Sequence, residues 1–213
     1  MFFLSMDSLE ERRERFLKLF ERAKKTYEDT DVRLAAEGWD KPWKVLITTI
    51  LSAQNRDPLT IKVGEDLFQT YPTIDALANA SYNDVLDVLS SVNYNKSKTE
   101  YVITTAKMLR DEHNGVVPDT MEELLAFHGV GRKTANLLLS EVFKKPAICV
   151  DTHVHRIANV FNLVDTEKRD NTEKQLKKVA PKDYWRHINR YFVLWGQDVP
   201  GHDKERLLRA LKD

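Results

Sequence analysis

The chain of 213 residues is long enough for one large domain or two small ones, and its 42% hydrophobic and 31% charged residues are typical of a globular protein. No run of 18 apolar residues is present, which excludes a membrane-spanning helix, and the single cysteine, Cys149, excludes an intramolecular disulfide and a cysteine-ligated metal or iron–sulfur cluster. The 33 basic and 33 acidic residues cancel, so net charge does not argue for a nucleic-acid partner.

The basic residues are nevertheless concentrated in one stretch. Between His128 and Val160, five basic residues (Arg132, Lys133, Lys144, Lys145 and Arg156) stand against Glu141 and Asp151, and five minus two gives a formal local charge of +3. Exposed charges act over about 8–10 Å in physiological salt, so this surplus is compatible with a polyanionic partner. The apolar start, residues 1–6, is too short for a secretory signal, and one cysteine suits a reducing compartment.

Helical periodicity dominates the sequence, and no alternating strand pattern appears. Three segments have the spacing of a capping box, in which a hydroxyl and a carboxyl satisfy the first backbone groups of a helix; they are Ser8–Glu11, Ser81–Asp84 and Thr120–Glu123. Asp40 with Pro42, and Pro58, are placed to start two more helices, and Asn114-Gly115 ends another that begins near Lys96.

The second half of the chain continues this pattern. A short helix from Thr120 breaks at His128-Gly129, and a second helix covers 132–143. Residues 146–150 are expected to be extended, after which Asp151 occupies an N-cap position. Later helices are expected at 152–161, 171–180, 183–195 and 203–212. The sequence therefore predicts an all-α fold with short connections.

The turn between the first two of these helices is the most informative segment. Its glycines, Gly129 and Gly131, allow positive φ and let a foreign backbone approach closely, while the N–H groups of the turn and the positive end of the following helix point to one place. That combination binds a phosphate and sets register on DNA without reading sequence. Arg132 and Lys133 favour this interpretation, and Val130 can pack inward. The alternative, that the glycines only turn one helix into the next, stays open.

Lys133 is the candidate nucleophile. An amine in the first turn of a helix lies at the positive end of the helix dipole, which disfavours the ammonium form, and partial burial would act in the same direction. A neutral lysine can form a Schiff base. Asp151, 18 residues further on, is the candidate partner, because its charge would favour a developing cation. The alternatives are a solvated lysine that contacts phosphate and an ordinary N-cap aspartate.

Residues 125–136, followed by Val150-Asp151-Thr152-His153, resemble the helix-hairpin-helix plus Gly/Pro-Asp signature of the endonuclease III superfamily of DNA glycosylases. Three upstream segments resemble further parts of that family in the same order; they are Leu51–Asp57, Asn95–Lys98 and His113–Pro118. The resemblance covers about residues 8–195.

The resemblance implies two helical modules with a DNA-binding cleft between them. One is a six-helix domain at 37–145 that contains the hairpin, and the other is built from 1–36 and 146–213. The implied partner is double-stranded DNA with damaged bases or abasic sites, and the protein is expected to be a monomer in the cytoplasm or at the nucleoid, with no membrane partner.

The resemblance also implies a chemistry. The damaged nucleotide is flipped out of the stack, the amine of Lys133 attacks the sugar C1′ and expels the base, and β-elimination from the Schiff base nicks the strand. Asp151 would activate the lysine and stabilise positive charge on the sugar. The implied function is base excision by a bifunctional DNA N-glycosylase and AP lyase, with oxidised pyrimidines as the expected substrates.

Several residues are expected to contact DNA by the same resemblance. Gln54 matches the residue that fills the vacated stack, and Tyr94 stands where an intercalating wedge is often leucine. The remaining expected contacts are Lys98, His128, Gly129, Val130, Gly131, Arg132 and His153. A monovalent cation held by hairpin carbonyls is implied as well, whereas zinc is not expected at His153 and His155, because histidines two apart on a helix diverge.

The chain departs from the family pattern in three places. The best-known members end in four cysteines that hold an iron–sulfur cluster, and no such cofactor is expected here. Basic residues near the end either replace its electrostatic effect or form a solvated helix; they are Lys204, Arg206, Arg209 and Lys212. His128 replaces a common proline, and Tyr94 leaves the lesion open. The alternatives are a glycosylase for alkylated or mismatched bases, one that does not nick, and a non-catalytic helix-hairpin-helix module.

Overall fold

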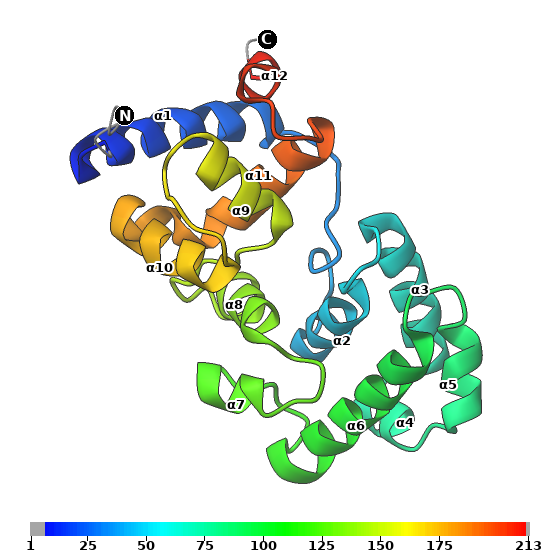
Figure 1. Ribbon diagram of the computed structural model, residues 1–213. Coiled ribbons are helices and arrows are strands. Elements are labelled where there is room, and N and C mark those ends of the chain that lie inside the picture. Colours follow the sequence, from blue (N-terminus) through cyan, green and yellow to red (C-terminus); the bar gives the residue numbers. More distant parts are fainter. Residues whose placement is uncertain (1–6, 212–213) are drawn as a thin grey trace. The chain divides into compact units, whose positions relative to one another are not determined.

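The structure, a computed structural model, describes residues 7–211, and these form helices and loops with no strand (Figure 1), which confirms the expected all-α fold. The chain divides into two compact units, residues 32–144 and the two terminal segments up to 31 and from 145. Residues 32–36 belong to the first unit, whereas the sequence placed them in the terminal one. Two hydrogen bonds tie them to the first unit: Arg33 donates to the Glu37 carbonyl at 2.7 Å, and the Ala35 N–H donates to Asp57 at 3.0 Å. No described helix is long and apolar enough to cross a membrane.

The 32–144 unit contains seven helices among its described residues, one more than the sequence predicts. They are α2 (Pro42–Ser52), α3 (Asp57–Thr70), α4 (Ile74–Ala78), α5 (Tyr82–Val88), α6 (Asn95–His113), α7 (Met121–Leu125) and α8 (Arg132–Glu141). The additional one is α4, which has five residues and is capped by the Thr73 hydroxyl. Helix α6 packs against α2, α4 and α5, and fully buried leucines such as Leu46, Leu77 and Leu109 fill the core between them.

Of the three capping boxes expected from the sequence, one forms completely, one forms in part and one does not form. Ser8 and Glu11 form the complete capping box expected, and Thr120 accepts a hydrogen bond from the Glu123 N–H. Ser81 occupies the N-cap position of α5, but its hydroxyl accepts no bond from the first turn, so the capping box expected there is wrong.

The terminal unit contains α1 (Leu9–Tyr27), α9 (Thr152–Val160), α10 (Arg169–Val179), a 3-10 turn (Lys182–Tyr184), α11 (Trp185–Asp198) and α12 (Lys204–Arg209). Helix α11 packs against both α1 and α9, and an aromatic core lies where they meet. Phe192 and Trp195 have ring centroids 6.0 Å apart, and both side chains are fully buried. The indole N–H of Trp195 also donates to the Leu207 carbonyl at 3.0 Å, which fastens α12 to the unit. Lys212 lies outside the described residues.

Candidate functional site

The hairpin between α7 and α8 is held from inside by two apolar side chains. Phe127 and Val130 are 2% and 6% exposed, and the ring of Phe127 lies 5.3 Å from that of His113. The Val130 N–H donates to the Phe127 carbonyl at 3.1 Å. Val130 therefore packs inward as expected and its N–H closes the turn, whereas its contact with DNA stays a prediction.

The two glycines of the hairpin have different reasons to be glycine. Gly129 has φ +80°, and a Cβ there would lie 2.7 Å from Cδ2 of Tyr101, so both the backbone and the packing of the chain require it. Gly131 has φ −97°, and a Cβ there would meet nothing within 4 Å. Of the two glycines, only Gly129 uses the positive φ that both allow. Neither the backbone conformation nor the packing of the chain requires glycine at position 131, which leaves the space beside the N-cap of α8 open.

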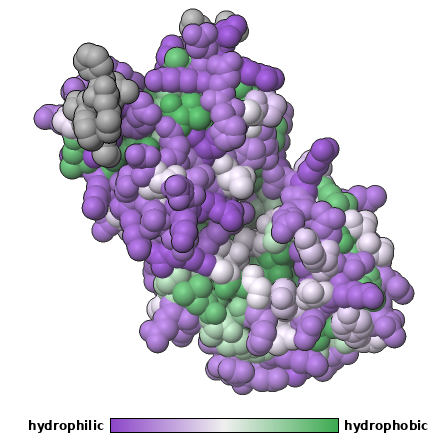
Figure 2. All heavy atoms as spheres, in the orientation of Figure 1, coloured by the Kyte–Doolittle hydropathy of each residue, from purple (hydrophilic) through white to green (hydrophobic). Residues whose placement is uncertain are grey.

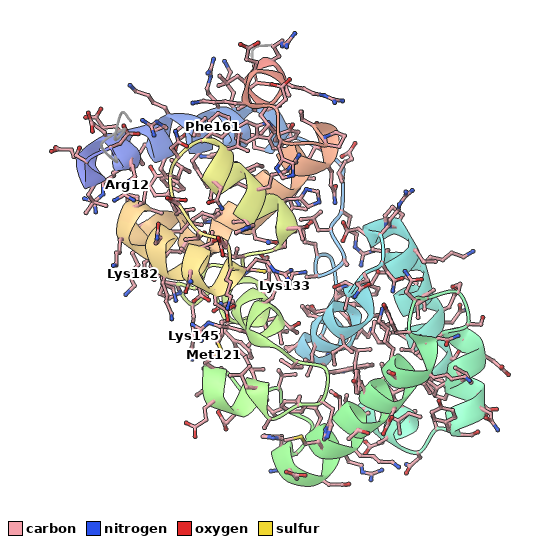
Figure 3. The ribbon with its side chains drawn as sticks, in the orientation of Figure 1. Arg12, Met121, Lys133, Lys145, Phe161 and Lys182 are labelled. Atoms are coloured by element: carbon pink, nitrogen blue, oxygen red, sulfur yellow. The ribbon has the colours of Figure 1, made fainter. Side chains whose placement is uncertain are left out.

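The start of α8 lies open beyond Gly131. No side chain caps the helix, its first turn has no acidic residue, and Gly131, Arg132 and Lys133 are all exposed, as is His128 in the turn. Lys133 is the second residue of the helix (Figure 3). The partial burial expected for Lys133 is not found. The uncapped positive end of the helix and its basic first turn make this part of the chain suited to an anion.

A second cluster in the same unit brings Gln54 and Tyr94 together. Both are exposed, and both have left-handed backbones, with φ +57° and +58°. Asn93 joins their loops by donating from Nδ2 to the Gln54 carbonyl at 2.6 Å. The sequence placed these two residues on separate segments, and their hydrogen-bonded proximity is a finding of the structure.

Lys98 does not have the exposed position expected of a DNA contact. Its side chain is 3% exposed, and Nζ donates to the carbonyls of Leu51 and Ala53 at 2.8 and 2.6 Å. Burial lowers the pKa of this ammonium to about 8. The predicted contact of Lys98 with DNA is therefore corrected, because its ammonium group is hydrogen-bonded to two backbone carbonyls inside the unit.

Asp151 is the N-cap of α9 in the terminal unit, as expected. Its carboxylate is half-buried and accepts from the Val154 N–H at 2.8 Å. Arg156, one turn further along α9, donates to the carbonyls of Gly196 and Val199 at 2.8 Å each and to that of Gly201. Burial lowers the pKa of Arg156, and the nearby negative charge of Asp151 opposes that shift.

His153, expected to contact DNA, is half-buried against α11. A Cβ at Gly196 would overlap the His153 ring, which explains a glycine inside a helix. His155 points elsewhere, with Nδ1 2.6 Å from the Thr172 hydroxyl. The sequence offered no local signal for the roles of Arg156 and Gly196, because both act on segments about 40 residues away.

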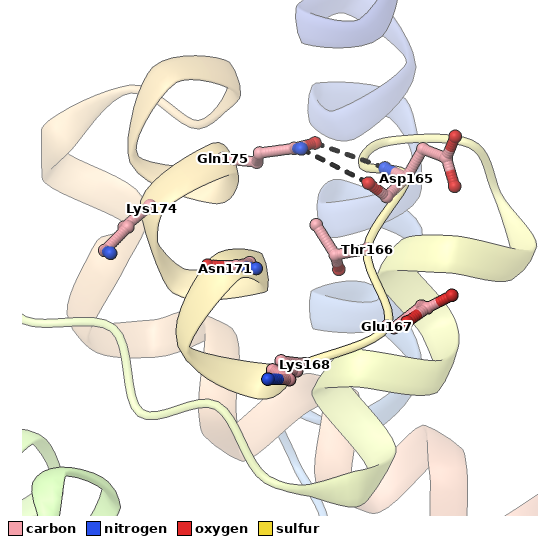
Figure 4. Close-up of a pocket in the computed structure, with 7 residues that line it drawn as sticks. All are labelled: Asp165, Thr166, Glu167, Lys168, Asn171, Lys174 and Gln175. Atoms are coloured by element: carbon pink, nitrogen blue, oxygen red, sulfur yellow. Dashed lines mark hydrogen bonds between the residues drawn. The ribbon is translucent and has the colours of Figure 1, made fainter.

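Two cavities lie within the terminal unit. The larger, of about 1030 Å³, is lined by α9, which contributes His153, His155 and Arg156, by residues 166–170 and by residues 200–202 with Gly196. The smaller, of about 460 Å³, lies between residues 165–168 and α10, where Gln175 exchanges two 3.2 Å hydrogen bonds with the backbone of Asp165 (Figure 4). Hydrophilic residues cover most of the face shown in Figure 2, which suits polar partners.

Comparison with known proteins points to one family. Residues 47–182 match the HhH-GPD superfamily of base excision DNA repair proteins. The chain is 43% identical to endonuclease III of Thermotoga maritima over 74% of each chain, and 32% identical to endonuclease III of Escherichia coli over 75% of each chain.

Solved structures agree with this similarity. A trapped covalent intermediate of endonuclease III with DNA has a TM-score of 0.80 and 30% identity, covering 87% of this chain and 86% of that one. A thermostable thymine-DNA glycosylase has a TM-score of 0.77 at 17% identity, covering 93% of this chain and 92% of that one, and it shares the fold.

Proposed function

The chain belongs to the HhH-GPD superfamily of base excision DNA repair proteins, and we propose that Lys133 is its nucleophile and Asp151 its acidic partner. Its activity is that of a DNA glycosylase with AP-lyase activity, as in endonuclease III. The observation that carries the residue assignment is the start of α8, where an exposed lysine follows a glycine that the fold does not require. A phosphate seated at that open helix end would bring the sugar to the amine.

The proposed chemistry needs one amine and one carboxylate. The amine nitrogen of Lys133 forms a bond to C1′ as the bond from C1′ to the base breaks, and the base leaves with the bonding electron pair and takes up a proton. Ring opening gives the Schiff base. Loss of a proton from C2′ then expels the 3′ phosphate, which nicks the strand, and water releases the lysine. Asp151 stabilises the positive charge that develops on the sugar and accepts the proton of the attacking amine.

Borohydride trapping on DNA with an abasic site tests this assignment. Wild-type protein is expected to form a covalent adduct, because reduction fixes the Schiff base, and Lys133→Gln is expected to form none. Lys107→Gln is the matched control, since Lys107 is an exposed lysine on α6. Undiminished trapping by Lys133→Gln would refute the nucleophile assignment. A wild-type protein that binds such DNA and neither traps nor nicks it would favour the non-catalytic module.

We propose oxidised pyrimidines as the substrates. The support is the higher identity to endonuclease III, compared with 14% for a 3-methyladenine glycosylase and 17% for an 8-oxoguanine glycosylase among solved structures. Release of base from duplexes with thymine glycol, an alkylated purine, uracil or 8-oxoguanine tests the assignment. Fastest release of the alkylated purine would replace it with the alternative considered from sequence.

We also propose that the protein acts without an iron–sulfur cluster and as a monomer. Cys149 is the one cysteine of the chain and is 1% exposed in the extended connection before Asp151, so the residues present do not fit a four-cysteine cluster. Arg156 instead holds the end of α11 and the segment that follows it, through the carbonyls of Gly196, Val199 and Gly201. Iron analysis and light scattering of the purified protein test both points, and bound iron in stoichiometric amount would contradict the first.

A further inference from the structure

Gln54 and Tyr94 stand on backbone conformations that residues with side chains rarely adopt. A left-handed φ costs a non-glycine residue on the order of 1 kcal/mol, and such residues persist only where the surrounding structure holds them. Tyr94 is also 64% exposed, although it is a large aromatic residue. The two side chains are thus exposed to solvent at an energetic cost. Hydrogen bonds within the unit hold their loops in these conformations.

A pair of asparagines joins the two loops. Asn93 donates from Nδ2 to the Gln54 carbonyl at 2.6 Å and from its backbone N–H to Oδ1 of Asn55 at 3.0 Å. Asn55 in turn donates from Nδ2 to the Leu51 carbonyl at 2.8 Å, at the end of α2. The loop after α2 and the loop before α6 are therefore one hydrogen-bonded structure.

Lys98 anchors this structure from inside the unit. Its ammonium binds the carbonyls of Leu51 and Ala53, the residue just before Gln54, and its backbone N–H donates to the Tyr94 carbonyl at 3.0 Å. One residue is thus bonded to both loops. Burying an ammonium is costly, and carbonyls at the negative end of α2 are the partners that compensate for it.

We propose that Lys98, Asn55 and Asn93 are positioning residues that hold Gln54 and Tyr94 as one rigid, two-pronged probe of the base stack. The proposal rests on the proposed function, since the stack belongs to the bound DNA. The Gln54 amide offers hydrogen-bond donors and an acceptor, and the Tyr94 ring offers a stacking face. Holding both before DNA arrives lowers the entropy cost of inserting them. Lys98 acts through the loops and does not touch DNA.

Probe insertion can be measured without base excision. A duplex with a tetrahydrofuran abasic analogue opposite 2-aminopurine cannot be cleaved at that sugar by a lyase, and the fluorescence of the 2-aminopurine reports its stacking. The wild-type protein is expected to change this fluorescence on binding. Lys98→Met keeps a side chain of similar length and removes the charge; it is expected to bind the duplex with a similar Kd and to lose most of the fluorescence change.

Two further variants keep the test decisive. Asn93→Ala removes the bond to Gln54 at an exposed position where no buried group is orphaned, so it is expected to fold and to lose part of the change. Lys107→Met, on an exposed part of α6, is expected to behave as wild type. The proposal would be overturned if Asn93→Ala changed the fluorescence as wild type does while Lys98→Met either did the same or failed to fold. It would also be overturned if Lys107→Met lost as much of the fluorescence change as the other two variants.

Trapping on a natural abasic site separates this proposal from the proposed function. If the wild-type protein forms the trapped adduct but leaves the 2-aminopurine fluorescence unchanged, the proposed probe is refuted and the assignment of Lys133 is not. A wild-type protein that changes the signal but does not trap refutes the chemistry assigned to Lys133 alone, and the comparison of Lys98→Met with wild type still decides the positioning role.

Discussion

The starts of α8 and α9 use the same physics in opposite ways. At α9 the Asp151 carboxylate accepts the Val154 N–H at 2.8 Å, so the positive end of that helix is occupied by a negative charge of the chain itself. At α8 the N-cap is Gly131, no side chain closes the first turn, and Arg132 and Lys133 add positive charge where the helix dipole is already positive. An arrangement that costs stability at α8 leaves a place for an anion from outside.

The largest effect is expected when the amine of Lys133 is removed from the uncapped first turn of α8. Lys133→Gln should lower nicking of abasic DNA by about a thousandfold or more, because no other group supplies the bond to C1′. The same change should leave the free energy of unfolding unchanged or raise it by about 0.3–1 kcal/mol, since a cation is removed from the positive end of a helix. Single-turnover nicking and urea denaturation measure the two. A variant that is both inactive and clearly destabilised would mean that Lys133 serves the fold.

At the N-terminus of α9, the effect of the Asp151 charge can be separated from the effect of its N-cap hydrogen bond. Asp151→Asn keeps an oxygen that can accept the Val154 N–H, so stability should be nearly unchanged, whereas Asp151→Ala should cost about 1 kcal/mol. Both should lower single-turnover nicking by about a hundredfold, because both remove the carboxylate. If Asp151→Asn keeps wild-type activity, Asp151 is only a cap.

These two starts also show how far sequence reasoning reaches. The glycines, the lysine and the N-cap aspartate are adjacent to helix boundaries, so local spacing predicted them. Burial was not predictable in the same way: Lys98 and Lys133 look alike in sequence, and only the packing of α6 against α2 buries the first. The short α4 was missed because five residues are too few for a periodic pattern. The role of Gly196 depends on His153, which the chain brings to it from 43 residues away.

Adding a side-chain cap to the N-terminus of α8 should weaken DNA binding. Gly131→Asp would place a capping carboxylate where a phosphate is proposed to bind, and it should raise Kd for abasic duplex by about tenfold while raising stability by a few tenths of a kcal/mol. Gly131→Ser is the uncharged control, with the same gain in stability and a smaller loss of affinity. Gly129→Ala, in contrast, should destabilise the fold by at least about 1 kcal/mol, because of its left-handed φ and its contact with Tyr101. Equal Kd for Gly131→Asp and wild type would refute phosphate binding at this helix.

The smallest expected effect concerns the opposite end of a helix, where Lys98 faces the carbonyls of α2. Burial lowers the pKa of Lys98 to about 8, so between that pH and its ordinary pKa the unfolded chain holds more protons than the folded one. Stability from this group is therefore gained as pH rises through the window and lost as pH falls through about 8. The stability difference between wild type and Lys98→Met should shift in favour of wild type from about pH 8 to pH 10, whereas the difference between wild type and Lys107→Met stays constant. A constant difference for Lys98→Met would mean that water reaches the ammonium, and Lys98 would then resemble Lys133 in environment as well as in sequence.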